Sequence, residues 1–158
     1  SAKIGAVYDE KLFQYMEDNL GKIIAKNLDV VDEVIKTAVK DKLDVILKDP
    51  HDQNLRHILN FGHTIGHAIE SASNNSISHG HAVGIGMIVE SEKFSPQVHE
   101  RIKNLITSLG FNPEKDDDLT RWILSDKKKV GNTVVIPVIE KIGNSHLEKI
   151  GIEILSDH

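Results

Sequence analysis

Apolar residues recur at helical intervals through residues 9–110, and this spacing constrains the fold more than any other feature of the chain. In residues 9–25 they follow steps of three and four, which is the stripe of one helix: Leu12, Phe13, Met16, Leu20, Ile23 and Ile24. We predict that Gly21 interrupts this helix. A second helix is predicted to begin near Asn27 or Asp29 and to stop at Asp49-Pro50, because a proline disfavours helical backbone in the residue before it.

Further helices are predicted over residues 55–70, over about 80–92, from Ser95-Pro96 to Leu109, and over a short stretch at 118–124. Beyond residue 132 the pattern changes to β-branched residues on both sides of Gly143-Asn144, which favours a hairpin. The expected fold class is therefore mainly α. We expect a single helical domain over residues 1–158, with a small β-hairpin near the C-terminus.

Composition excludes several classes of function. The 158 residues carry a net charge of -5 with both signs interspersed, so no basic surface for nucleic acid or an anionic membrane is predicted. The chain contains no cysteine, which excludes thiolate metal sites and agrees with a reducing cytosol. Apolar runs are far shorter than the roughly 20 residues that cross a bilayer, and no signal peptide is recognisable. We expect a soluble, cytoplasmic protein.

Two of the nine histidines lie in the segment Asn60-Phe-Gly-His63-Thr-Ile-Gly-His67-Ala-Ile-Glu70. Their spacing of four places both side chains on the same face of the predicted helix. A glycine precedes each histidine, and a glycine inside a helix costs about 1 kcal/mol relative to alanine. Close approach of another backbone or of a ligand would explain Gly62 and Gly66, and tight helix packing without chemistry is the alternative.

A third histidine, His79, stands in Ser78-His79-Gly80 at the start of the next predicted helix. The metal of an enzyme site commonly has three protein ligands and one open position, and histidines on successive helices can supply two of the three. The third ligand would be a carboxylate or a histidine elsewhere. The alternative is that His79 only caps its helix.

These residues together resemble a known family. The run Arg56-His-Ile-Leu-Asn60-Phe-Gly-His63-Thr-Ile-Gly-His67-Ala-Ile-Glu70, followed by Ser78-His79-Gly80, resembles the signature of the 3-dehydroquinate synthases and related sugar phosphate cyclases. The likeness extends to Lys3–Phe13, to Lys42–Ile46 and to Asp126–Lys128. It implies the C-terminal, metal- and substrate-binding domain of a two-domain enzyme. The N-terminal NAD-binding domain would be absent from this chain, and the full-length enzyme would be a homodimer.

The resemblance also implies roles for single residues. His63 and His79 would bind a divalent metal, zinc or cobalt, and the third ligand would be a glutamate just before Ser1. An anionic sugar phosphate would be held by the remaining site residues, with Asn60 bonding a hydroxyl: Lys3, Lys42, Arg56, Asn60, His67 and Lys128. For Lys128 a solvated run of charge over 127–129 is an equal alternative. His81 departs from the family, in which a glutamate is common at that position.

The activity implied is the NAD-dependent conversion of 3-deoxy-D-arabino-heptulosonate 7-phosphate to 3-dehydroquinate and phosphate, in the shikimate pathway. The chain by itself is expected to be inactive. Three alternatives stay open: a domain of another cyclase of the inosose or valiolone synthase type, a non-catalytic metal-binding helical module, and a histidine-rich metal-storage protein.

Overall fold

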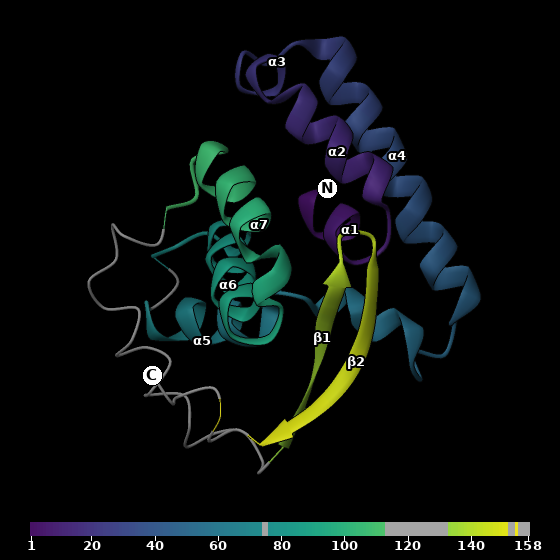
Figure 1. Ribbon diagram of the computed structural model, residues 1–158, viewed down its shortest axis with the longest axis vertical. Helices are drawn as coiled ribbons and strands as arrows, with labels where there is room; N and C mark the ends of the chain where they lie inside the picture. Colours follow the sequence, from purple (N-terminus) through teal and green to yellow (C-terminus); the bar gives the residue numbers. More distant parts are fainter. Residues whose placement is uncertain (74–75, 113–132, 152–153, 155–158) are drawn as a thin grey trace.

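The computed structural model describes residues 1–73, 76–112, 133–151 and 154, and it confirms a mainly helical fold with one β-hairpin (Figure 1). The helices and strands are α1 (Ala2–Val7), α2 (Glu10–Asp18), α3 (Leu20–Ile24), α4 (Leu28–Lys48), the 3₁₀ helix η1 (Leu55–Asn60), α5 (His63–Ala72), α6 (His79–Phe94), α7 (Pro96–Ser108), β1 (Thr133–Lys141) and β2 (Asn144–Gly151). The helix predicted at 118–124 and Lys128 lie outside the described residues. No helix in the described part of the chain is long and apolar enough to cross a membrane.

The first predicted helix is present as two helices, α2 and α3, and the break lies at Asn19 rather than at Gly21. Asp9 caps α2, because its carboxylate accepts from the backbone N–H groups of Lys11 and Leu12 at 2.9 and 3.2 Å. The predicted limits of α4 are confirmed. Asn27 caps this helix by accepting from the N–H of Val30 at 3.1 Å.

The single helix predicted over residues 55–70 is wrong, since η1 and α5 are separated by Phe61 and Gly62. Asp49 fixes the entry to η1: its carboxylate accepts from the N–H groups of Asn54 at 2.8 Å and Arg56 at 3.0 Å. Gly62 has a φ of 77°, a left-handed conformation that side chains disfavour. This glycine therefore precedes α5 instead of lying inside a helix.

Helices α5 and α6 cross with their backbones in contact. A Cβ placed on Gly86 of α6 would lie 2.1 Å from the carbonyl oxygen of Gly62 and 2.8 Å from the nitrogen of Gly66. A Cβ on Gly66 would lie 3.0 Å from the Cα of Val83. The prediction that Gly62 and Gly66 permit close approach of another backbone is confirmed, and the backbone is that of α6.

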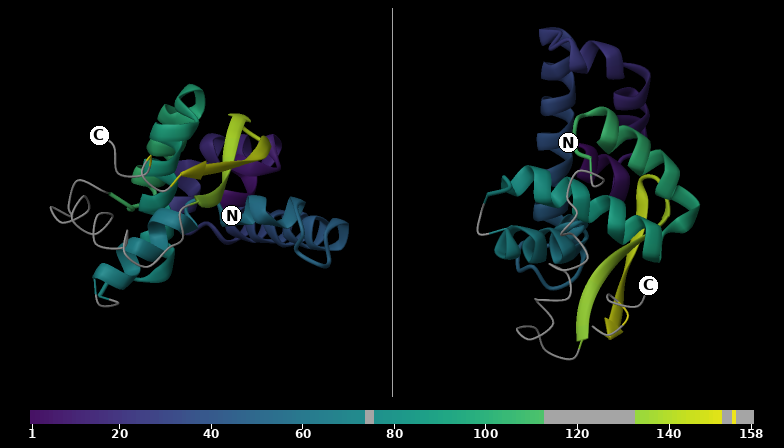
Figure 2. Two further views of the ribbon diagram at one scale, coloured as in Figure 1. Left: turned by 90° about the horizontal axis from the view of Figure 1, so that it is seen from below. Right: turned by 90° about the vertical axis from the view of Figure 1, so that its left-hand side faces the viewer.

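Helix α1 lies between two groups of elements (Figures 1 and 2). One group consists of α2 and α4 and the other of α7 and the hairpin, and α1 contacts both. The hairpin is antiparallel, with Thr133 opposite Gly151 and Pro137 opposite Leu147, and β1 also packs on η1, α6 and α7. Around α1 the core includes the fully buried side chains Val7, Phe13, Val45, Phe61, Ile102 and Ile139.

Candidate metal and substrate site

Three imidazole rings meet where α5 crosses the start of α6. His63 and His67 lie one turn apart on α5, and His79 is the first residue of α6. The ring centroids are separated by 5.5 Å for His63 and His67, 5.4 Å for His63 and His79, and 5.9 Å for His67 and His79. Two imidazoles bound to one tetrahedral zinc, at Zn–N distances of about 2.0–2.1 Å, have centroids roughly 5 Å apart. The three centroid distances are close to that value, and the ligand atoms that lie within 4.8 Å of one another are those of His67, Glu70 and His79.

The hydrogen-bond partners of His63 and His79 indicate which ring nitrogens are free. The Nδ1 of His63 lies 3.2 Å from the carbonyl oxygen of Phe61, and the Nδ1 of His79 lies 3.1 Å from Oε2 of Glu70. An acceptor oxygen at Nδ1 favours the proton there, so that Nε2 keeps its lone pair. The ammonium of Lys3 lies 3.5 Å from Nε2 of His63, as suits an unprotonated nitrogen. Both rings therefore offer Nε2 as a ligand atom.

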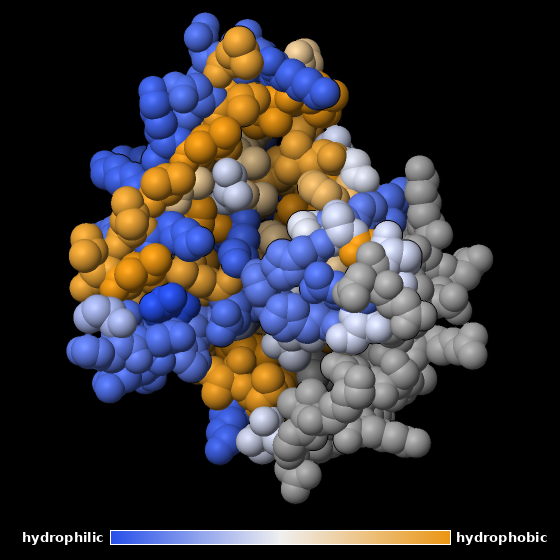
Figure 3. Space-filling model, turned by 180° about the vertical axis from the view of Figure 1, so that it is seen from behind, coloured by the Kyte–Doolittle hydropathy of each residue, from blue (hydrophilic) through white to orange (hydrophobic). Residues whose placement is uncertain are grey.

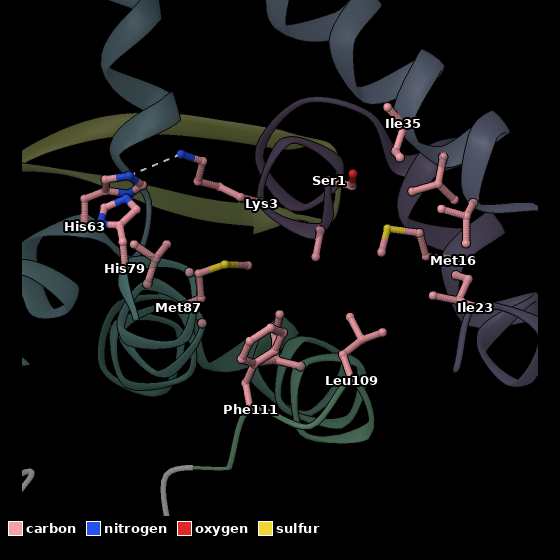
Figure 4. A pocket seen from close by; sticks show the side chains of 17 residues that line it. Ser1, Lys3, Met16, Ile23, Ile35, His63, His79, Met87, Leu109 and Phe111 are labelled. Carbon is pink, nitrogen blue, oxygen red and sulfur yellow. Dashed lines mark hydrogen bonds between the residues drawn. The ribbon is translucent and has the colours of Figure 1, made fainter. Parts of the chain in front are cut away.

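His63 and His79 line one end of a cavity of about 450 Å³, together with Ser1 and Lys3. Figure 4 shows Lys3 extending toward His63, with His79 beside it. The remaining wall is largely apolar and includes Met16, Ile23, Ile35, Met87, Leu109 and Phe111. A few polar groups at one end of an apolar cavity is the usual composition of a small-molecule site.

Burial and positive charge lower the pKa values of two groups at the polar end of this cavity, Lys3 and His63. Burial, and then the nearby Lys42, lower the pKa of Lys3 from 10.5 to about 8. Burial, and then Lys3, lower the pKa of the His63 ring from 6.5 to about 4. At neutral pH His63 is thus uncharged and able to bind a metal, while Lys3 keeps a charge that an anionic ligand would stabilise.

The structure brings some of the other predicted site residues to this centre and leaves others outside both cavities. Lys42 lines an adjoining cavity of about 280 Å³ whose wall includes Ser1, Lys3 and Leu59. The exposed ring of His67 lies beside the other two histidines. Arg56 and the exposed Asn60 belong to η1, immediately before α5, and line neither cavity.

His81 does not join the three histidines. Its ring contacts the Phe111 ring edge-on at a centroid distance of 5.4 Å. Phe111 also lines the cavity, so His81 contacts one residue of the apolar wall. The sequence left its role open, and its position favours packing over metal binding.

Comparison with known proteins decides the family. Residues 1–129 match the family described as 3-dehydroquinate synthase C-terminal. The chain belongs to this family. It is 35% identical to the 3-dehydroquinate synthase of Thermodesulfovibrio yellowstonii, over 89% of this chain and 43% of that protein. It is 34% identical to the enzyme of the same name from Picrophilus torridus, over 97% of this chain and 47% of that protein. The chain thus spans less than half the length of these relatives.

Solved structures of sugar phosphate cyclases share the fold, among them the following two. The 2-epi-5-epi-valiolone synthase of Streptomyces hygroscopicus, with NAD⁺ and Zn²⁺ bound, superposes with a TM-score of 0.75 at 22% identity, over 97% of this chain and 46% of that one. A 2-deoxy-scyllo-inosose synthase, complexed with carbaglucose-6-phosphate, NAD⁺ and Co²⁺, gives 0.62 at 21% identity, over 79% and 39%. These similarities support the fold of the 3-dehydroquinate synthase C-terminal family.

Two glutamates of this family member contact the site without having been predicted to do so. Glu90 on α6 is fully buried and accepts from the N–H groups of Gly62 at 2.7 Å and Ile65 at 3.2 Å, at the start of α5. Glu70 is grouped with His67 and His79, with potential ligand atoms within 4.8 Å of one another. The sequence held a signal for each contact. Glu90 is the one glutamate in the apolar run 82–91, and Glu70 lies three residues after His67, on the same helix face.

Proposed function

We propose that this chain is the metal- and substrate-binding part of a 3-dehydroquinate synthase. The reaction would convert 3-deoxy-D-arabino-heptulosonate 7-phosphate to 3-dehydroquinate and phosphate, with NAD held by another part of the protein. The observation that carries the proposal is the position of the His63 and His79 rings, with centroids 5.4 Å apart, beside the partly buried ammonium of Lys3. The names of relatives that are 34–35% identical support the choice of reaction.

In this proposal His63 and His79 hold a divalent metal, zinc or cobalt. The neutral His63 ring and the spacing of the two rings fit such an ion, and a carboxylate would complete the set of three protein ligands. When bound, the metal would polarise the substrate hydroxyl that NAD oxidises. The chain's own histidines would fix where that hydroxyl lies.

The substrate carries a carboxylate and a phosphate, and the proposal assigns both to cationic side chains. Lys3 and Lys42 lie close enough for Lys42 to lower the pKa of Lys3, so an anion between them would relieve their repulsion. We assign Arg56 and His67 to a second anionic group and Asn60 to a hydroxyl. Lys128 remains a proposed contact from sequence alone.

Several properties of the whole protein remain proposals. We propose a single domain over residues 1–158, a cytoplasmic homodimer for the full-length enzyme, and no nucleic-acid or membrane partner. We also propose that the chain alone has no turnover. Incubation of the purified chain with NAD, Co²⁺ and the heptulosonate phosphate should release no phosphate, and release would contradict this.

Metal titration tests the site itself. Co²⁺ added to the chain should occupy one site with an absorption spectrum typical of nitrogen and oxygen ligands, and His63→Ala or His79→Ala should abolish it. His51→Ala, at an exposed histidine before η1, is the matched control and should leave binding unchanged. Several weak, equivalent sites would instead indicate a storage protein. Binding that survives both histidine replacements would refute the proposal.

Substrate identity needs a separate test, because other sugar phosphate cyclases share this fold. The heptulosonate phosphate has a carboxylate that glucose 6-phosphate lacks. Perturbation of the Lys3 and Lys42 NMR signals should therefore require several-fold less of the heptulosonate phosphate than of glucose 6-phosphate. Equal or reversed preference would favour an inosose or valiolone type of enzyme.

A further inference from the structure

Glu70 links the two helices that carry the histidines. It lies near the end of α5, three positions after His67, and its Oε2 is 3.1 Å from Nδ1 of His79, the first residue of α6. The carboxylate is 28% exposed and the His79 side chain 55%, so the pair lies at the rim of the site. Helix α6 has no acidic residue in its first turn, so no acid there could take the place of Glu70.

We propose that Glu70 is a positioning residue that fixes the tautomer and the orientation of His79 for metal binding. This inference rests on the proposed function in one respect, namely that His79 is a metal ligand. A neutral imidazole carries its proton on either nitrogen, and a proton on Nε2 would block the lone pair that faces the site. A carboxylate beside Nδ1 keeps the proton on Nδ1 and raises the basicity of Nε2.

His63 and His79 differ in the group that contacts Nδ1, and this difference is the reason to assign a positioning role to Glu70. The Nδ1 of His63 meets a backbone carbonyl, that of Phe61, and the ring is half-buried. His79 is exposed, and its Nδ1 contact is to a side chain. The orientation of His79 therefore depends on a replaceable residue, whereas that of His63 follows from the fold.

A competing role for Glu70 is that of a direct ligand with His67 and His79, since the three lie close enough to share an ion. The two roles make different demands on the carboxylate. A positioning residue needs an acceptor oxygen, which glutamine retains. A ligand needs a negative oxygen, and a neutral amide is a poor substitute for one on zinc or cobalt.

The experiment compares Glu70→Ala with Glu70→Gln in the chain, using Co²⁺ alone as the probe. In the metal-free chain, ¹⁵N-edited NMR of the imidazoles should show His79 protonated at Nδ1 in the wild type and in Glu70→Gln, and shifted toward protonation at Nε2 in Glu70→Ala. The Kd for Co²⁺ should rise about 10–100-fold in Glu70→Ala and only about threefold in Glu70→Gln, with an unchanged cobalt spectrum.

The control is Glu148→Ala, which removes the carboxylate 2.8 Å from Nε2 of His146 on the hairpin and should alter neither readout. An unchanged His79 tautomer in Glu70→Ala would overturn the proposal. So would equal losses of affinity in both variants with an altered cobalt spectrum, the result expected of a direct ligand. If the wild-type chain binds no Co²⁺ at His63 and His79, the proposed function fails, while the tautomer measurement still decides the role of Glu70.

Discussion

At the scale of single residues, the site contains a lysine, Lys3, whose charge is unfavourable in its position. Lys3 is partly buried beside His63, and its pKa lies well below the ordinary value because burial and Lys42 both disfavour its charge. Its depressed pKa means that Lys3 contributes its full stability above pH 10.5 and loses it as the pH falls through 8. At pH 7 the charged side chain therefore destabilises the folded chain.

Replacing Lys3 by methionine should stabilise the protein at pH 7. We expect the free energy of unfolding to rise by about 1–2 kcal/mol, after allowance for partial solvent screening. This gain should shrink as the pH rises through 10.5, because above that value the lysine becomes neutral in both states. Urea unfolding at pH 7, 9 and 10.5 measures it, with the exposed Lys22→Met as control. A gain that does not change with pH would mean that packing, not charge, is responsible.

At the scale of elements, a side chain of α6 caps α5. Gly62 has no side chain to accept from the first N–H groups of α5, and the carboxylate of Glu90 takes this role from across the helix crossing. Burial raises the pKa of Glu90 to about 7 against these hydrogen bonds. Because the folded value exceeds 4.5, this group's contribution to stability is full below pH 4.5 and is lost as the pH rises through 7.

Glu90→Ala should leave the buried N–H groups of Gly62 and Ile65 without an acceptor. We expect a loss of about 2–3 kcal/mol in the free energy of unfolding at pH 5. The loss should become smaller as the pH rises toward 8. Amide exchange at Ile65 and urea unfolding report these effects, and the exposed Glu92→Ala provides the control. Unchanged protection of Ile65 would show that Glu90 does not cap the helix.

The crossing of α5 and α6 makes a second prediction at this scale. Gly86→Ala should push the helices apart, because its Cβ would overlap the backbone oxygen of Gly62. The expected loss is about 3 kcal/mol, with weaker Co²⁺ binding because His63 and His79 move with their helices. Gly21→Ala in α3 meets no atom within 4 Å and should instead stabilise the chain by about 0.5–1 kcal/mol. Similar effects of both substitutions would argue against contact between the backbones.

At the scale of the whole molecule, a band of exposed hydrophobic side chains follows α4, and Ile35 of this band also lines the 450 Å³ cavity (Figure 3). The exposed fractions are 81% for Leu28, 51% for Ile35, 52% for Val39, 53% for Leu43 and 77% for Leu47. Contiguous apolar surface of this kind promotes association in water.

The double replacement Leu43→Gln with Leu47→Gln should therefore reduce self-association of the chain at high concentration, as measured by sedimentation velocity. Its effect on unfolding should stay within about 0.5 kcal/mol per site, since both side chains are already exposed. Val45→Ala is the contrasting variant. Val45, two positions from each of them in the sequence, is fully buried in the core, and its truncation should cost about 1–3 kcal/mol. A wild-type chain that stays monomeric at every concentration would contradict the first part.

The features that sequence alone could predict were local ones. The limits of α4 followed from Asn27 and Asp49-Pro50, and the shared face of His63 and His67 followed from their spacing. The break at Gly62 was missed because apolar periodicity continues across it. Helix α1 was missed because its residues are buried on nearly every side and show no amphipathic stripe. The contacts of Glu70 and Glu90 depend on how two helices meet, which no single segment encodes.

The tip of the hairpin bonds to the end of α1, and these contacts affect the order in which the chain folds. The N–H of Gly143 donates to the carbonyl oxygen of Ala6 at 2.8 Å, and the Ser145 hydroxyl donates to that of Val7, also at 2.8 Å. During synthesis the N-terminal segment with Lys3 leaves the ribosome long before these partners exist. Such remote contacts form slowly. The two bonds that join the end of α1 to the hairpin therefore form only after residues 143–145 have been made, so the surroundings of Lys3 are completed late in synthesis.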